Sequence, residues 1–129
     1  MEPTIYRLKV TLRGSRPPIW RMVEVRSDVT LSQLHDVIQL AMGWTNSHLH
    51  QFRRGSTYYG PANPDLDMPQ RNEQRVRLHG VLQKPKDRMV YEYDFGDGWE
   101  HDVVLERSTP GLPDGPQVRV TGGTGACPP

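Results

Sequence analysis

Residues 91–102 read YEYDFGDGWEHD, with aromatic and acidic residues alternating on both sides of a Gly-Asp-Gly centre. An alternation with period two that is interrupted by glycines is typical of a β-hairpin. We predict a three-residue loop over 96–98, which places Tyr93 directly opposite His101. A two-residue turn would instead place Asp94 opposite His101, so the length of the loop decides which chemistry the hairpin presents.

The three-residue loop gives this hairpin two different faces. The aromatic face consists of Tyr91, Tyr93, Phe95, Trp99 and His101, and the acidic face of Glu92, Asp94, Glu100 and Asp102. Like charges directly across a strand pair destabilise it, so an acidic face requires counter-charges. We expect arginine or lysine to supply them, and the candidates are Arg7, Lys9, Arg21 and Arg26.

A helix is the best defined element of the first half of the chain. Thr30 and Gln33 match a capping box at its start. The apolar stripe that follows at helical spacing consists of Leu34, Val37, Ile38 and Ala41. The helix is therefore expected over 31–42, and Gly43 is a suitable residue to end it. We expect His35, near the start of the helix, to face water.

Strands are expected on both sides of this helix, because apolar and polar residues alternate there. Their ranges are 6–12, 19–26, 48–54, the hairpin over 88–106, and 117–121. Residues 60–75 contain prolines and no periodicity, which is typical of a long surface loop, and 76–82 suggest a short helical turn. The sequence thus predicts a single α+β domain over residues 1–129. It is β-grasp-like, with a mixed sheet packed on one main helix and a C-terminal β-hairpin.

The composition limits the class of protein. The chain has 129 residues, 35% of them hydrophobic and 24% charged, which fits one polar globular domain. No apolar run reaches the length of a membrane span. The single cysteine excludes an internal disulfide, and the N-terminus has no signal-peptide pattern, so we expect a cytoplasmic protein.

Charge is unevenly distributed although the net charge is only +1. Residues 1–54 contain eight Lys or Arg against four Asp or Glu, a net charge of +4, and residues 84–106 contain three against seven, a net charge of −4. Either these segments neutralise each other in the fold, or the first of them forms a basic surface for nucleic acid.

A metal site is one candidate for function. His48 and His50 lie two residues apart, so on a strand both point to the same face. With His101 and Cys127 they offer nitrogen and sulfur ligands that zinc accepts. The spacing matches no established zinc pattern, and the competing interpretation, which we favour, is that His48 and His50 hydrogen-bond locally and His101 stacks on Tyr93.

Catalysis is a second candidate, because carboxylates packed together raise one another's pKa. Asp94 and Asp97 would hold a divalent ion such as magnesium or zinc, and His101 would serve as the general base of a phosphodiesterase or nuclease. The competing interpretation is a sheet face of structural ion pairs, which gathers the same residue types.

Binding of a nucleic acid or a protein is the third candidate. Arg53, Arg54 and Tyr58 interleave basic and aromatic side chains, as platforms for single strands do. Trp44 and Trp99 are suited either to the core or to the lining of a groove.

Three groups of residues resemble the plasmid pRi ORF-three-like family, some members of which are labelled passenger TnpR proteins of insertion elements. They are YRLKV with PIWR at residues 6–10 and 18–21, MGW with HLHQF at 42–44 and 48–52, and YDFGDGWEH at 93–101. The resemblance covers nearly the whole chain. It implies a non-catalytic binding or accessory module of a plasmid or transposable-element gene set. It also implies that family members continue with a tail after Cys127-Pro128-Pro129.

Overall fold

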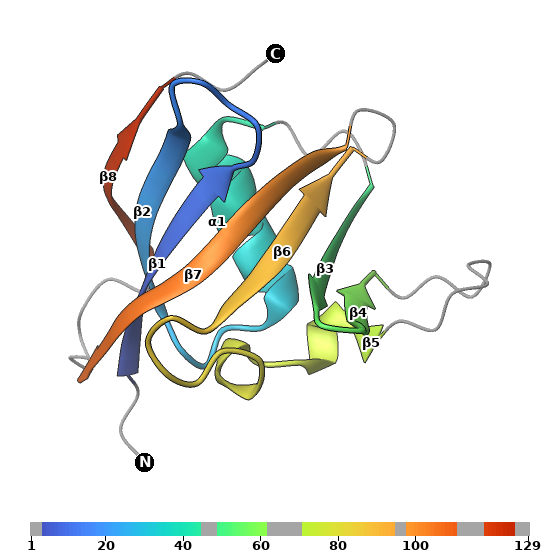
Figure 1. Ribbon diagram of the computed structural model, residues 1–129. Helices are drawn as coiled ribbons and strands as arrows, with labels where there is room; N and C mark the ends of the chain where they lie inside the picture. The colour runs from blue at the N-terminus through green and yellow to red at the C-terminus, as the bar shows by residue number, and fades with distance from the viewer. Residues whose placement is uncertain (1–3, 45–48, 62–70, 95–97, 111–117, 126–129) are drawn as a thin grey trace.

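The computed structural model describes residues 4–44, 49–61, 71–94, 98–110 and 118–125. In chain order the elements are β1 (Thr4–Leu12), β2 (Ile19–Arg26), α1 (Leu31–Met42), β3 (His50–Arg54), β4 (Thr57–Gly60), β5 (Arg71–Asn72), η1 (Glu73–Arg75), η2 (Leu78–Gly80), β6 (Arg88–Tyr93), β7 (Trp99–Pro110) and β8 (Val118–Thr124). The strands form one sheet in the order β5-β4-β3-β6-β7-β1-β2-β8, and α1 crosses one of its faces (Figure 1). The predicted α+β class with a mixed sheet and one main helix is confirmed.

The sheet is mixed because the strand pair at one of its edges is parallel. All neighbouring strands pair antiparallel except β4 and β5, which are parallel. Figure 1 shows the β1–β2 loop, the last turn of α1 and the start of β7 at the same end of the sheet. Segments that are far apart in the chain therefore meet at this end.

The helix forms where its local signals predict it. The Thr30 hydroxyl accepts a hydrogen bond from the Gln33 N–H at 3.1 Å, and the Gln33 amide oxygen accepts one from the Thr30 N–H at 2.9 Å. This completes the capping box and fixes the first turn. Gly43 ends the helix with a φ of 78°, a left-handed conformation that glycine adopts without steric cost.

The hydrophobic core lies between this helix and the sheet. Alternate residues of β1 point into it, and Leu34 and Ile38 of α1 are fully buried against them. Phe52, Tyr91 and Tyr93 add large aromatic side chains from β3 and β6. None of the described helices combines the length and the apolar character that spanning a bilayer requires.

The hairpin of β6 and β7 differs from its predicted register. Tyr93 pairs with Trp99 and Tyr91 pairs with His101, so the connection covers residues 94–98 and the predicted loop over 96–98 is wrong. The shift is two residues, and because side chains alternate with period two, each one keeps its face. The Gly98 N–H donates to the Asp94 carbonyl at 2.6 Å, which closes the connection.

Further differences concern short elements. β4 was not predicted, although Gly55-Ser56 supplies a two-residue turn between Arg54 and Thr57. The expected surface loop over 60–75 contains β5 and η1 among its described residues. The short helical turn expected in 76–82 is present as η2.

Candidate functional site

Two carboxylates of the acidic face, Glu100 and Asp102, are neutralised by arginines from outside the hairpin. Arg13, after the end of β1, donates from Nε and Nη2 to Asp102 at 3.0 and 2.8 Å and from Nη1 to Glu100 at 3.1 Å. Arg53 of β3 donates to Glu100 at 2.9 Å. The hydrogen bond with Asp102 raises the pKa of Arg13. The expectation that arginine would neutralise this face is confirmed for Glu100 and Asp102, whereas Glu92 accepts a hydrogen bond from Gln51 at 2.9 Å.

The four residues predicted for that role have other neighbours. The Cα partners of Arg7 are Glu24 and Arg107. Lys9 lies over the Trp20 ring, with Nζ 5.0 Å from its centroid. Arg21 donates to main-chain carbonyls of Trp20, Ala41, Thr124 and Gly125. Arg26 pairs with Asp28 at 2.8 Å. Lys9 shares the sheet face of Asp102, because Asp102 pairs with Thr11, two residues from Lys9. Sharing a face was therefore not enough to identify the partners.

His101 is fully buried, and both of its ring nitrogens have hydrogen-bond partners. Nε2 is 3.3 Å from the Trp44 indole nitrogen, and Nδ1 is 3.1 Å from the Tyr91 carbonyl oxygen. An indole N–H can only donate, so Nε2 accepts and Nδ1 carries the proton that it donates to Tyr91. Burial lowers the pKa of His101, which favours this neutral form.

A second polar group lies in the core between α1, β3 and β6. The His50 Nε2 is 2.8 and 2.9 Å from the two carboxylate oxygens of Glu73. The His35 ring stacks on His50 with centroids 3.5 Å apart, and its Nδ1 is 2.6 Å from the Tyr91 hydroxyl. Gln39 donates to the same hydroxyl at 2.8 Å. Burial raises the pKa of Tyr91.

Sequence reasoning missed most of this group. His35 was expected to face water, but it is only 4% exposed and faces the sheet. The available signal was its spacing of one helical turn from Gln39, which places both side chains on one face of α1. Glu73 follows a segment without periodicity, so nothing in the sequence indicated its burial.

The predicted metal ligands are only partly described. His50 bonds to Glu73, and His101 bonds to Trp44 and Tyr91. Within the described ranges, no group of three or more histidine, cysteine or carboxylate side chains is placed to hold a metal ion. His48 and Cys127 lie outside those ranges, so the site that they were expected to complete stays a prediction.

The predicted catalytic carboxylates are also incompletely placed. Asp94 begins the hairpin connection with a φ of 60°, and its N–H donates to the Leu49 carbonyl at 2.9 Å. Asp97 lies outside the described residues. The Cα partners of His101 in β6 and β1 are Tyr91 and Leu12, so the structure does not place Asp94 directly opposite His101.

The predicted nucleic-acid platform is divided between two faces of the sheet. Arg53 pairs with Tyr58 across β3 and β4, so these two side chains share a face. Arg54 points to the other face, where it donates to the Val81 carbonyl. Arg53 is occupied by Glu100, and therefore neither arginine is available as an unpaired cation.

Trp44 and Trp99 are brought together and pack, partly buried, against the hydrophobic core. Their ring centroids are 6.2 Å apart and their planes differ by 24°. Trp44 follows the C-terminal end of α1, where its N–H donates to the Gln39 carbonyl at 2.9 Å. Trp99, the first residue of β7, lines a pocket with a volume of about 400 Å³.

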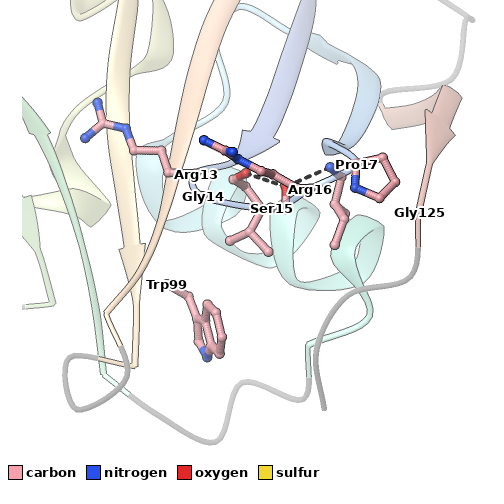
Figure 2. A pocket seen from close by; sticks show the side chains of 9 residues that line it. Arg13, Gly14, Ser15, Arg16, Pro17, Trp99 and Gly125 are labelled. Carbon is pink, nitrogen blue, oxygen red and sulfur yellow. Dashed lines mark hydrogen bonds between the residues drawn. The ribbon is translucent and has the colours of Figure 1, made fainter.

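This pocket lies between the β1–β2 loop (residues 13–18) and Trp99 (Figure 2). Leu12, Ile19 and Trp99 supply apolar surface, and Arg13, Ser15 and Arg16 supply polar groups. The Ser15 hydroxyl donates to the Leu12 carbonyl at 2.8 Å and accepts from the Ile19 N–H at 2.9 Å. Its single proton is therefore already engaged within the loop.

Arg16 is the available cation of the pocket. Its side chain is exposed and makes no hydrogen bond or ion pair within the part of the chain that the structure describes. The backbone N–H groups of Gly14, Ser15 and Arg16 likewise have no acceptor among those residues. Arg13 differs, because Glu100 and Asp102 already accept from its guanidinium.

The fold and this arrangement define an α+β domain with a pocket beside two tryptophans. The chain belongs to the plasmid pRiA4b ORF-3-like family, which matches residues 4–129. The resemblance seen in the sequence is thereby confirmed.

Two relatives extend this assignment. The chain is 40% identical over 131 residues to the uncharacterized protein y4hQ of Sinorhizobium fredii, and the match covers 100% of the chain and 66% of y4hQ. The chain thus spans slightly less than two thirds of that relative. The crystal structure of MM3350, a protein of unknown function from Methanosarcina mazei Go1, is similar with a TM-score of 0.89 and 28% identity. That match covers 100% of this chain and 74% of MM3350.

Proposed function

We propose that the protein is a non-catalytic binding module and that its binding site is the pocket between the β1–β2 loop and Trp99. One observation carries this proposal: the exposed Arg16, which has no partner within the described residues, lines the same pocket as the Trp99 indole. Arg13 and Arg53 instead pair with Glu100 and Asp102. Ligand pockets combine apolar or aromatic surface with a few polar groups that fix the orientation of the ligand, and Trp99 and Arg16 supply both.

The alternative, a metal-dependent hydrolase using Asp94, Asp97 and His101, has less support. An enzyme requires its reacting groups around one cleft with room for substrate. His101 is 0% exposed and both of its ring nitrogens are engaged, so it offers no base to a substrate. The observed geometry of His101 thus favours a structural role.

The biological setting is part of the same proposal. We infer a single domain that acts in the cytoplasm for a plasmid or transposable-element gene set, with a nucleic acid or a protein as its partner. The plasmid-derived family name supports the gene set, and the single cysteine supports the compartment. We also propose that the protein is TnpR-like and that its fold is β-grasp-like. The element order β1, β2, α1 supports the β-grasp-like fold.

Binding at the pocket can be tested by chemical-shift mapping on ¹⁵N-labelled protein. The probes are a short single-stranded oligonucleotide, a nucleoside 5′-monophosphate and an unstructured acidic peptide. We expect at least one of them to shift the Trp99 indole N–H and the backbone N–H groups of Gly14 and Arg16. Trp99→Ala should abolish these shifts, and Trp20→Ala, on the other side of the sheet from α1, should retain them.

Two results would contradict the proposal. Shifts confined to Arg53 and Tyr58 would move the binding site to the sheet face and restore the platform hypothesis. Hydrolysis of a phosphodiester in the presence of magnesium or zinc, lost in Asp94→Asn, would establish the enzyme instead.

A further inference from the structure

We infer that the pocket takes a small ligand that combines a flat aromatic ring with one anionic group, either a phosphate monoester or a carboxylate. This inference rests on the proposed function of the pocket and adds the chemical class of its ligand, which is distinct from the nucleic acid or protein proposed above as partner. Its two parts follow from two different walls of the pocket, the indole of Trp99 and the loop that carries Arg16.

The aromatic part of the ligand matches the Trp99 wall. Behind Trp99 lies Trp44, whose ring is 6.2 Å away, and Trp44 itself packs against Tyr93 at 5.3 Å. The hydrogen bond from Trp44 to His101 holds this second ring in place. Trp99 therefore presents a supported planar surface to the pocket, and flat rings stack on such surfaces with little dependence on their identity.

The anionic part matches the β1–β2 loop. Arg16 is a cation without a partner among the described residues, and the N–H groups of Gly14 and Ser15 are donors without acceptors there. Successive backbone N–H groups and a guanidinium are the groups that bind carboxylate and phosphate oxygens. One small anion would use donors that the fold itself leaves unused.

The surrounding charges limit the ligand to one such anion. Near the pocket, Arg13 and Arg53 are paired with Glu100 and Asp102, and Arg21 donates to the carbonyls of Thr124 and Gly125. Arg16 is therefore the pocket cation whose donors have no acceptor among the described residues. The affinity of a protein for a polymer of phosphates depends on many cations, and the paired arginines beside the pocket are not free to supply them. A pocket of about 400 Å³ also has the size of a small-molecule site.

The test measures affinities by tryptophan fluorescence for a nucleoside 5′-monophosphate, the matching nucleoside, an aromatic carboxylate and inorganic phosphate. We expect the monophosphate or the carboxylate to bind at least about tenfold more tightly than the nucleoside and than phosphate alone, because only they use both walls. The tighter binder of the monophosphate and the aromatic carboxylate shows whether the anionic group of the ligand is a phosphate or a carboxylate. Chemical-shift changes at Trp99 and Gly14 must accompany binding.

Variants test the role of the cation. Arg16→Ala should lower the affinity for the anionic ligand roughly tenfold and leave that for the nucleoside unchanged, since it removes one charge-assisted contact. Arg16→Lys should retain part of the affinity. Arg75→Ala, which removes an exposed arginine of η1, is the matched control and should have no effect.

Failures of the two proposals are distinguishable. If the nucleoside binds as tightly as the monophosphate and the carboxylate, or if Arg16→Ala behaves like Arg75→Ala, the ligand class is wrong while the pocket remains the binding site. If an oligonucleotide or a peptide binds at the pocket tenfold more tightly than every small probe, the ligand is a macromolecule and this inference fails. If no probe shifts Trp99 or Gly14, the pocket is not a binding site and both proposals fall.

Discussion

Removal of the Tyr91 hydroxyl tests the polar group in the core most directly. The hydroxyl accepts from the Gln39 side chain at 2.8 Å and lies 2.6 Å from His35 Nδ1. Since Gln39 donates, the proton of the hydroxyl is available for the histidine nitrogen. Tyr91→Phe keeps the ring and its packing but removes the partner of both groups.

The expected loss of stability follows from these two contacts. A buried polar group that loses its partner costs about 1–3 kcal/mol. The two groups share one hydroxyl and both have further interactions, so their costs are not additive. We therefore expect Tyr91→Phe to lower the free energy of unfolding by about 2–4 kcal/mol.

Urea unfolding followed by circular dichroism measures this difference. The slope of the free energy against urea should stay unchanged, because the surface exposed on unfolding is the same. Tyr58→Phe is the control, since Tyr58 is only half-buried and its hydroxyl has no hydrogen bond within the described part of the chain. Its cost should stay below about 0.5 kcal/mol. If Tyr91→Phe also costs less than about 0.5 kcal/mol, at an unchanged slope, the hydroxyl is not the link between α1 and the sheet.

Four further substitutions test other parts of the structure. Ile38→Ala should cost about 2–5 kcal/mol in urea unfolding, because Ile38 is fully buried against the sheet, and an unchanged midpoint would remove α1 from the core. Glu73→Ala should cost about 3–5 kcal/mol by the same assay, since it leaves a buried histidine without its partner, whereas a cost below about 1 kcal/mol would mean that the pair is not formed. Arg13→Ala should cost only about 0.2–1 kcal/mol for each of its half-exposed ion pairs, and a cost that does not shrink in 1 M salt would contradict a surface role. His101→Gln should flatten the dependence of stability on pH. Below about pH 6.5 the unfolded chain protonates His101 while the folded chain, with its lowered pKa, does not, so wild-type stability falls as the pH decreases, by up to about 1.4 kcal/mol per pH unit. Equal slopes for both proteins between pH 7 and 5.5 would show that His101 is protonated in the folded state.

The helix and the hairpin faces could be predicted because their signals are local. The capping box and the apolar stripe of α1 lie within a few residues of each other, and tertiary packing does not change them. The faces of the hairpin depend only on period two, which survives a shift of two residues. The exact pairing could not be predicted, because the glycine-rich run allows several loop lengths. Asp94 adopts a positive φ that aspartate tolerates, and this lengthened the connection.

The core polar group and the pocket could not be predicted because they depend on contacts between distant segments. His35 and Tyr91 are 56 residues apart, and His50 and Glu73 are 23 residues apart. The pocket likewise combines the loop after β1 with the first residue of β7. Residue types indicated chemistry at His50 and His101, but only the tertiary structure determines whether such groups face a ligand or each other.

His101 connects the core to the pocket, which gives the residue first considered for catalysis a different role. The Tyr91 carbonyl fixes its protonated nitrogen, and its other nitrogen fixes the Trp44 indole. Trp44 in turn supports Trp99, the aromatic wall of the pocket. This chain of contacts is rigid only while His101 is neutral, because a second ring proton would remove the acceptor for the indole N–H. The burial that lowers the pKa of His101 thus also preserves the position of the wall, and the same property makes His101 unsuited to exchange protons with a substrate.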